Sequence, residues 1–454
     1  MALEELDARK TNKQKLGVIL ALALPAMIEN ILQTVVGFVD TLFVAKIGLN
    51  EVTAVGVANA ILAVYLAIFM AIGVGTSSLI SRNIGAGEMG RAKSIARQST
   101  IISIIAGILF AIITLLFSDP LLRMMGATEE VLTDGRLYLQ IVGLSSVFIA
   151  LMLTFGSILR AAGDTKTPMK VSLWINVVHI ALDYILIFGL IGLPGFGVAG
   201  AAWATVIVRI LGTFALYYYI KKSSVSFSMF GGGSKEDTRS ILSLSTPAAM
   251  ERLVMRLGQV LYFGLIVKIG SDTYAAHTIA GNIETFSYMP GYGLAVAATT
   301  LVGQHIGAKR FRDAYQYGIL TTGVAVGFMS LIGVVLYFLS PWFATWFTKD
   351  QNAIDMVVTA LRIDAFAQPA LAVGLVLAGA LQGSGDTKSP MYSTAIGMWG
   401  IRVIGVYILG IQLGMGIAGI WISIAIDLYV RGAYLFYKFR KVVGKLSLTK
   451  SSIP

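Results

Sequence analysis

The stretch LALPAMIENILQTVVGFVDTLFVAKIG at residues 22–48 aligns with LSTPAAMERLVMRLGQVLYFGLIVKIG at residues 244–270, at an offset of 222 residues. The alignment places Pro25 opposite Pro247. Each stretch is longer than the roughly 20 apolar residues that an α-helix needs to cross a bilayer. The pair therefore predicts membrane helices and an internal duplication.

The same offset continues along the chain without a gap. It lays LRAAGDTKTPM (159–169) over LQGSGDTKSPM (381–391) with seven identities in eleven, and GTSSLISRNIGA (75–86) over AATTLVGQHIGA (297–308). Six apolar segments lie within one offset, and an even number gives both copies the same orientation in the membrane. This predicts a parallel repeat of two six-helix lobes, an arrangement that places transport sites near the bilayer midplane.

The composition excludes a soluble enzyme. Of 454 residues, 56% are apolar and 13% are charged, whereas soluble domains are roughly 45–50% apolar and about 25% charged. The mean hydropathy is +0.78. The net charge of +11 is spread between the apolar runs, so we expect a lipid bilayer and no nucleic acid as partner. The absence of cysteine excludes disulfides and thiolate metal sites.

We predict an all-α polytopic membrane protein with twelve transmembrane helices, because the apolar runs are continuous and do not alternate as barrel strands do. The Gly- and Ser-containing segment 221–239 has the composition of a flexible linker. It separates an N-terminal lobe (1–220) from a C-terminal lobe (240–454). The predicted helices are 16–45, 53–80, 94–117, 135–160, 169–190, 198–220, 241–267, 273–302, 314–339, 354–381, 390–411 and 416–437.

The distribution of Lys and Arg predicts the orientation. The N-terminus and the loops on its side carry 24 of these residues, and the opposite loops carry five. Cytoplasmic loops hold the excess of positive charge. We therefore expect a multi-pass protein of the cell (plasma or inner) membrane with both termini in the cytoplasm and an uncleaved first span.

Asp40 is the sharpest candidate for a functional residue. A charge at the bilayer centre costs at least about 2.5–3.5 kcal/mol, so intramembrane acids are functional hypotheses. No basic residue lies within five positions of Asp40, and the nearest is Lys46. An apolar surrounding favours the neutral acid, which predicts proton exchange. Gln33 lies two turns earlier on the same face. Neutralisation of Asp40 by a neighbouring helix is the structural alternative.

The predicted fifth helix carries a second polar face. Asn176, His179 and Asp183 follow one another at spacings of three and four residues, so they share one side of the helix. Oxygen atoms of Asn and Asp suit a monovalent cation, and the imidazole suits a proton relay. Both interpretations remain open at this point.

The second half distributes its charges differently. Tyr262 stands at the position that repeats Asp40. In this half the number of intramembrane arginines nearly equals the number of intramembrane acids, so we expect most of these charges to be paired. Arg252 and Arg256 share a face, and with Arg402 they are the basis of an alternative function, a flippase for lipid-linked precursors. These arginines and acids are Arg252, Arg256, Arg362, Arg402, Arg431, Glu251, Glu284, Asp364 and Asp427.

The repeated motifs indicate turns, and the usual nucleotide-binding and catalytic motifs are absent. The two GDTK[TS]P segments have the Gly, Asp and Pro of a turn that starts a helix. There is no GxxxxGK[ST] loop, no HExxH and no suitably placed GxSxG. We therefore expect no catalytic residue, no enzyme activity and no cofactor. The energy for transport would then come from an ion gradient or a partner. An ion channel is a further alternative, but the sequence shows no selectivity-filter signature for one.

The sequence resembles the MATE (multidrug and toxic compound extrusion) transporters from its first span to its last. The resemblance rests on VVGFVDTLFVAKIG (35–48), RAAGDTKTPM (160–169), LDYILIFG (182–189), GVAGAAWAT (197–205) and AAHTIAGNIETFSYMPGYGLAVAATTLVGQ (275–304). It implies a V-shaped pair of six-helix lobes that exports cationic amphipathic compounds in exchange for H+ or Na+, generally as a monomer.

Within this family the sequence resembles the DinF-type branch, in which an acid on the first helix couples ion movement to substrate export. Residue by residue, the family cation positions fall on Asp40, Asp183 and Thr205. The Asn usual four positions before the second Asp is His179 here, which disfavours a Na+ site and favours protons. Leu371 occupies the position of the NorM-type Asp, so the corresponding second-lobe ion site is expected to be absent.

We therefore predict an antiporter that exchanges cationic compounds for H+ through protonation of Asp40 and alternating access. Asp183, His179, Asn176 and Thr205 would share the coupling. Gln33, Asp40, Asn176 and Asp183 would bind substrate. The alternatives are Na+ coupling at Asp40, Asp183 and Thr205, and the lipid flippase.

Overall fold

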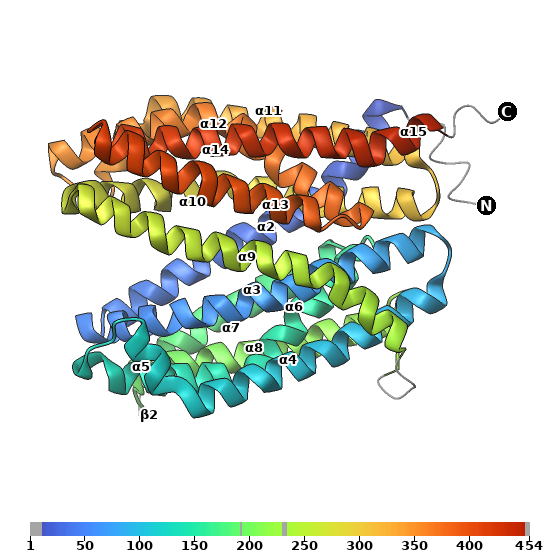
Figure 1. Ribbon diagram of the computed structural model, residues 1–454. Coiled ribbons are helices and arrows are strands. Elements are labelled where there is room, and N and C mark those ends of the chain that lie inside the picture. Colours follow the sequence, from blue (N-terminus) through green and yellow to red (C-terminus); the bar gives the residue numbers. More distant parts are fainter. Residues whose placement is uncertain (1–10, 191–192, 229–233, 450–454) are drawn as a thin grey trace. The chain divides into compact units, whose positions relative to one another are not determined.

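The computed structural model describes residues 11–190, 193–228 and 234–449. Nearly all of these residues are helical, and Figure 1 shows long helices throughout both halves of the chain. A two-residue strand pair, β1 (Gly189–Leu190) and β2 (Leu193–Pro194), forms a small antiparallel hairpin after the fifth predicted helix. This hairpin was not predicted, and it is too short to show the alternation that marks a strand.

The described helices correspond one for one to the twelve predicted ranges. In the first half they are α2 (Asn12–Ala45), α3 (Leu49–Gly85), α4 (Met89–Met124), α5 (Glu129–Leu144) with α6 (Ser146–Ala161), α7 (Lys166–Phe188) and α8 (Gly197–Lys222). In the second half they are α9 (Lys235–Ile269), α10 (Ser271–Gly307), α11 (Phe311–Thr345), α12 (Gln351–Ser384), α13 (Lys388–Ala395) with the π-helices η1 (Ile396–Val403) and η2 (Val406–Gln412), and α14 (Gly416–Phe439), followed by η3 (Arg440–Gly444) and α15 (Lys445–Thr449).

Most helices are longer than predicted, because the backbone hydrogen bonds continue past the apolar window into polar residues. The predicted range 94–117, for example, becomes Met89–Met124. Two segments are irregular. The fourth is a pair of helices bent by 49° at Ser145, and the eleventh contains the π-helical turns η1 and η2. Irregularity of this kind is not visible in hydropathy.

Nine helices in the described ranges are long and apolar enough to cross a membrane, and ten if the bent pair is one span. The two remaining predicted spans, α9 and α10, are not among them. Both are long, with 35 and 37 residues. Their polar and charged residues lower the mean hydropathy of both helices.

The described chain forms two compact units. Unit 1 contains the chain up to Met27, residues Ser81–Gly87 and the chain from Met250 onward; unit 2 contains Ile28–Ile80 and Glu88–Ala249. Both α2 and α9 therefore pass from one unit into the other. The division into lobes at 221–239 stays a prediction, and residues 229–233 of that segment lie outside the described residues.

The two GDTK segments are helix-connecting turns, as predicted. Gly163 and Gly385 have φ values of 91° and 95°, a conformation that only glycine adopts without strain. The following aspartates each accept a backbone hydrogen bond, from Thr167 to Asp164 at 2.9 Å and from Ser389 to Asp386 at 2.9 Å. The duplicated sequence therefore forms the same local structure twice.

A buried apolar cluster in unit 2 fixes the helices that carry the candidate site. It includes Tyr65 and Phe69 of α3, Leu139 of α5, Ile187 of α7 and Ala202 of α8, and these side chains are between 0% and 5% exposed. Close packing of this kind holds α7 and α8 in register. The polar side chains between these packed positions consequently have defined places.

Candidate functional site

Three helices of unit 2 bring the predicted residues together. Asp40 lies near the end of α2, His179 and Asp183 lie one turn apart on α7, and Thr205 lies on α8. One ligand atom from each of Asp40, His179 and Asp183 lies within 4.8 Å of the others. The sequence predicted the pair on α7 from its spacing. The convergence of α2, α7 and α8 on one point is a product of the fold.

The centre of the cluster is the Nε2 atom of His179. It lies 3.4 Å from Thr205 Oγ1, 3.5 Å from Asp183 Oδ2 and 3.8 Å from Asp40 Oδ2. These distances exceed the usual hydrogen-bond range of about 2.7–3.2 Å. One ring nitrogen thus faces three oxygen atoms without a tight bond to any. A proton on this nitrogen has three alternative acceptors.

Burial differs sharply among the members of the cluster. Asp183 is 1% exposed and His179 is 8% exposed, whereas the Asp40 side chain is 32% exposed. Within the described ranges, Asp40 Oδ1 and Asp183 Oδ2 accept no hydrogen bond. A buried ionised carboxylate without donors is costly. The site therefore favours a proton or a bound cation, and Asp40 is its accessible member.

The structure adds two residues that the sequence analysis did not assign to the site. Tyr138 on α5 is 6% exposed, and its hydroxyl interacts with Thr205 and with the charges of Arg209 and Asp40. The second residue is Arg209 on α8. Its position four residues after Thr205 on the same helix was the available signal; Tyr138 carried none.

The other predicted residues lie nearby on the same helices. The side-chain amide of Asn176 donates to Ser172 Oγ at a long 3.5 Å, one turn before His179. Gln33 is exposed on α2, two turns before Asp40. The roles of both residues in binding stay predictions.

The donor set decides which ion fits. Carboxylate and hydroxyl oxygens of Asp40, Asp183 and Thr205 suit a hard cation such as Na+. The imidazole nitrogen of His179 lies among these oxygens, and it is a poor ligand for such an ion. Thr205 Oγ1 already donates to the Ala201 carbonyl at 3.0 Å, which leaves its lone pairs free to accept. The cluster therefore offers oxygen ligands to a cation and several acceptors to a proton.

Glu29 does not join this cluster. Both of its carboxylate oxygens accept hydrogen bonds from Arg160 Nη1 at 3.1 Å. Glu29 is 9% exposed, so the ion pair is largely buried. Its charge is compensated, in contrast to the charges of Asp40 and Asp183.

The second half contains a compensated network. Asp427 is 0% exposed, and it accepts hydrogen bonds from Arg402 at 2.8 Å and from Arg431 at 2.5 and 2.6 Å. The Arg402 guanidinium also lies 5.8 Å from the centre of the Tyr262 ring. The expected pairing is confirmed for these charges. The expectation that most of these charges are paired is not met: among the described residues Asp364, Glu284, Arg256 and Arg362 have no ion pair. Asp364 instead accepts from Gln368 at 2.6 Å, Arg256 donates to Gln259, and Arg362 donates to the Tyr337 carbonyl.

The arginines of the flippase alternative differ in their contacts. Arg402 is held by Asp427, Arg256 Nη1 donates to Gln259 at 3.3 Å, and Arg252 interacts with Glu251. A phosphate-binding site needs guanidinium groups that are free to receive the ligand. Of the three, Arg402 is fully engaged, whereas Arg256 is exposed and keeps donors available, so the lipid flippase stays an untested alternative.

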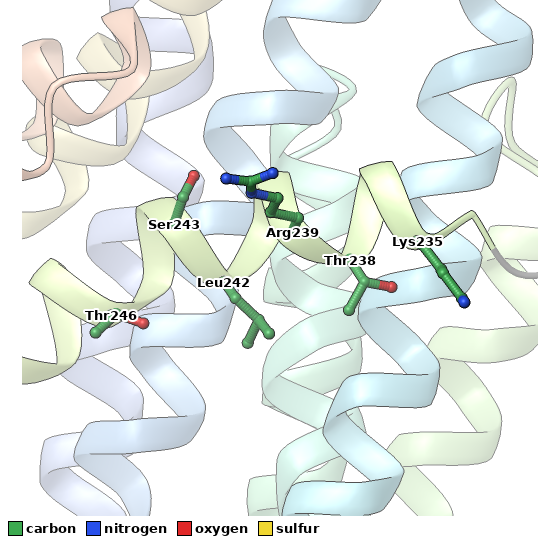
Figure 2. A pocket seen from close by; sticks show the side chains of 6 residues that line it. All are labelled: Lys235, Thr238, Arg239, Leu242, Ser243 and Thr246. Atoms are coloured by element: carbon green, nitrogen blue, oxygen red, sulfur yellow. The ribbon is translucent and has the colours of Figure 1, made fainter.

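A separate hollow of about 510 Å3 lies along the first part of α9. Figure 2 shows its six lining side chains, two of them basic and three bearing hydroxyl groups, along this one helix. It contains no carboxylate, so it is chemically unlike the Asp40 cluster. The lining residues are Lys235, Thr238, Arg239, Leu242, Ser243 and Thr246.

Comparison with known proteins identifies the fold. The sequence profile of the MatE family matches residues 25–185 and again 247–408, which reproduces the internal repeat. The chain is 31% identical to the uncharacterized transporter YisQ of Bacillus subtilis, with 95% of this chain and 96% of that protein covered. It is also 31% identical to the probable multidrug resistance protein NorM of Thermotoga maritima, with 96% and 95% covered.

Solved structures agree over nearly the whole chain. A MATE structure in the bent conformation superposes with a TM-score of 0.90 at 25% identity, covering 98% of each chain. A MOP superfamily transporter from Pyrococcus furiosus, whose pocket is described as reversed in polarity, gives 0.89 at 26% identity over 96% of this chain and 97% of that chain. The predicted class, an all-α membrane protein of two six-helix lobes, is confirmed. Its relatives are transporters and not enzymes, and the chain belongs to the MatE family of membrane transporters.

Proposed function

We propose that this protein is a multidrug exporter that exchanges cationic amphipathic compounds for protons at the cluster of Asp40, His179 and Asp183. Relatives from Thermotoga maritima and Pseudomonas aeruginosa carry the name multidrug resistance protein. The observation that carries the proposal is the position of His179 Nε2 between two carboxylates and a hydroxyl. We propose a monomer of the DinF-type branch in the cell membrane, with both termini in the cytoplasm.

The coupling follows from competition for one charge. An ionised Asp40 attracts a cationic substrate, and a proton that neutralises Asp40 removes this attraction. Because Asp183 and His179 lie beside it, they adjust their hydrogen bonds to the protonation of Asp40. A proton and a bound cation cannot both neutralise the same carboxylate, so each displaces the other.

The energetics are adequate for export. One charge moved across the membrane is worth about 2.3 kcal/mol per 100 mV. A proton-motive force of about 150 mV therefore supplies roughly 3.5 kcal/mol, from the same relation. Because about 1.4 kcal/mol corresponds to a factor of ten, one proton sustains a substrate gradient of a few hundred-fold.

The test is transport of ethidium, a fluorescent cationic dye, by the purified protein in liposomes. A proton gradient and a Na+ gradient are imposed separately on wild type, Asp40→Asn and Tyr262→Phe. Tyr262 stands at the repeat-equivalent position of Asp40 outside the cluster, so Tyr262→Phe is the matched control. We expect proton-driven flux in wild type and in the control. In Asp40→Asn the flux should fall by at least about 100-fold, or about 2.7 kcal/mol.

Three outcomes contradict the proposal in different ways. Flux driven only by Na+ assigns the cluster to a cation. Full flux in Asp40→Asn removes Asp40 from the mechanism. If neither gradient moves ethidium, the protein is not an exporter of this class of compound.

A further inference from the structure

The beginning of α2 is held by a buried ion pair in unit 1. Lys15 is 4% exposed. Its Nζ atom donates to Asp313 Oδ1 at 2.9 Å and to Gln316 Oε1 at 2.5 Å, both on α11. The same ammonium group lies 5.5 Å from the centre of the Tyr317 ring. For a lysine near a chain end, this is an unusually complete set of partners.

The beginning of α9 is held in unit 2 by hydrogen bonds and by a longer contact to the half-exposed Arg91. Asp237 is 6% exposed. Its Oδ2 atom accepts a hydrogen bond from Ser94 on α4 at 2.5 Å, and its Oδ1 atom lies 3.8 Å from Arg91 Nε. One turn further along α4, Gln98 donates to Thr238 at 2.7 Å. The first turn of α9 is therefore attached to α4.

The internal repeat relates these two contacts. The offset of 222 carries Lys15 onto Asp237, and it carries Arg91 onto Asp313. The pairs thus occupy equivalent positions with their charges exchanged. Ser94 and Gln316, which complete the two sets of bonds, are also equivalent. Each contact joins a helix of one half to a helix of the other, and the repeat forms it twice although no residue of the pair is the same.

Both held ends belong to helices that change unit. Lys15 lies in the part of α2 that packs in unit 1, whereas Asp40 lies in the part that packs in unit 2. Asp237 lies in the unit 2 part of α9, and the helix continues into unit 1 from Met250. Pro25 and Pro247 lie just before the two changes of unit. Proline inside a helix removes one backbone hydrogen bond and allows bending.

We propose that the pairs Lys15–Asp313 and Asp237–Arg91 are permanent anchors of α2 and α9, which stay closed during transport. Because an anchored end cannot slide, any rearrangement of the two units acts on the part of α2 between Pro25 and Asp40. Lys15 and Asp313 are then positioning residues for Asp40, which they do not contact. Opening the Lys15–Asp313 pair would leave a buried lysine without its charge partner, and opening the second contact would leave the buried Asp237 without Ser94 and Arg91. Both costs favour anchors over a gate that opens in every cycle. This inference rests on the transport activity proposed above.

The first test replaces the charge of one anchor. Lys15→Met keeps an unbranched side chain, and Asp313 remains paired with Arg310 at 2.8 Å, so the variant should fold. We expect ethidium turnover in proteoliposomes to fall about tenfold while the Kd for ethidium stays unchanged, because the Asp40 cluster is intact. Lys15→Arg should restore turnover. Lys13→Met, an exposed lysine of the same helix end, is the matched control.

The second test replaces an anchor by a covalent bond. The chain has no cysteine, so Ser94→Cys with Asp237→Cys introduces a single possible disulfide. An anchor predicts slow turnover in the reduced variant and restored turnover after oxidation. A gate predicts the opposite, with oxidation stopping transport and reductant restoring it. That opposite result would overturn the proposal, as would equal losses of turnover in Lys15→Met and Lys13→Met.

Separate measurements test the proposed function and the proposed anchors. If wild-type protein moves no ethidium, the proposed function fails, whereas the anchors are still measured by thermal unfolding in detergent. Anchors predict a lower Tm for Lys15→Met than for Lys13→Met, and a higher Tm for the oxidised than for the reduced double-cysteine variant. Equal values in both comparisons would reject the anchors even in the absence of transport.

Discussion

Equivalent positions in the two halves of the chain carry different sets of charged groups. Three positions of the first-half site have equivalents in the second-half network: Asp40 and Tyr262, Thr205 and Asp427, Arg209 and Arg431. In the first half, two carboxylates face one imidazole at 3.5 and 3.8 Å. In the second half, one carboxylate is held by two guanidinium groups at 2.5–2.8 Å.

This difference shows how a duplicated fold separates stability from function. A guanidinium stays charged at all relevant pH values, so the network around Asp427 is static. An imidazole can bind and release a proton, so the cluster around Asp40 can change state. A repeat keeps the helices in place and leaves the chemistry at each position free to diverge.

The largest expected effect breaks the static network. Asp427→Asn removes the negative charge that both buried arginines contact, and it should lower the free energy of unfolding by about 3–5 kcal/mol. At the equivalent position of the first half, Thr205→Val removes only a hydroxyl group and should cost about 1 kcal/mol. Thermal unfolding of both variants in detergent makes the comparison. Equal losses would refute the distinction between the halves.

A smaller effect is expected when the imidazole of His179, which can gain or lose a proton, is removed. His179→Gln keeps a polar side chain that cannot gain or lose a proton. Proton-driven ethidium transport should fall about tenfold, or about 1.4 kcal/mol, with little change in unfolding temperature. His305→Gln is the matched control, since that imidazole in unit 1 has its Nδ1 atom 2.7 Å from the Leu301 carbonyl. Equal transport by both variants would exclude His179 from the coupling.

The smallest effect concerns a glutamate that both halves share and its different partners, Arg160 in the first half and Gln382 in the second. Glu29 is bonded to Arg160, and the equivalent Glu251 accepts from Gln382 at 3.5 Å and from Thr394 at 3.2 Å. Arg160→Gln copies the second-half arrangement and should cost about 1 kcal/mol of unfolding free energy. Arg160→Leu, which supplies no donor, should cost more. A neutral Arg160→Leu would mean that Glu29 does not depend on this pair.

Several features of the fold were predictable because they follow from local composition. Apolar runs located the twelve helical segments, and the Gly and Asp of the GDTK motifs located two turns. The bend at Ser145 and the π-helical turns around Arg402 were not predictable, because they depend on packing against neighbouring helices and leave the hydropathy unchanged. The spacing on α7 predicted that His179 and Asp183 share a face. Nothing in the sequence placed Tyr138 beside Thr205.

The sequence by itself determined that the chain is a duplicated, helical membrane protein with acids inside the membrane segments of its first half, because lipid as a solvent penalises every charge and makes the exceptions visible. Only the tertiary structure decided which of these charges are compensated. Glu29 and Asp427 are paired by arginines distant in sequence, whereas Asp40 and Asp183 meet a single imidazole. Compensation depends on distances between helices, and those distances are set by packing and not by the order of residues along one helix.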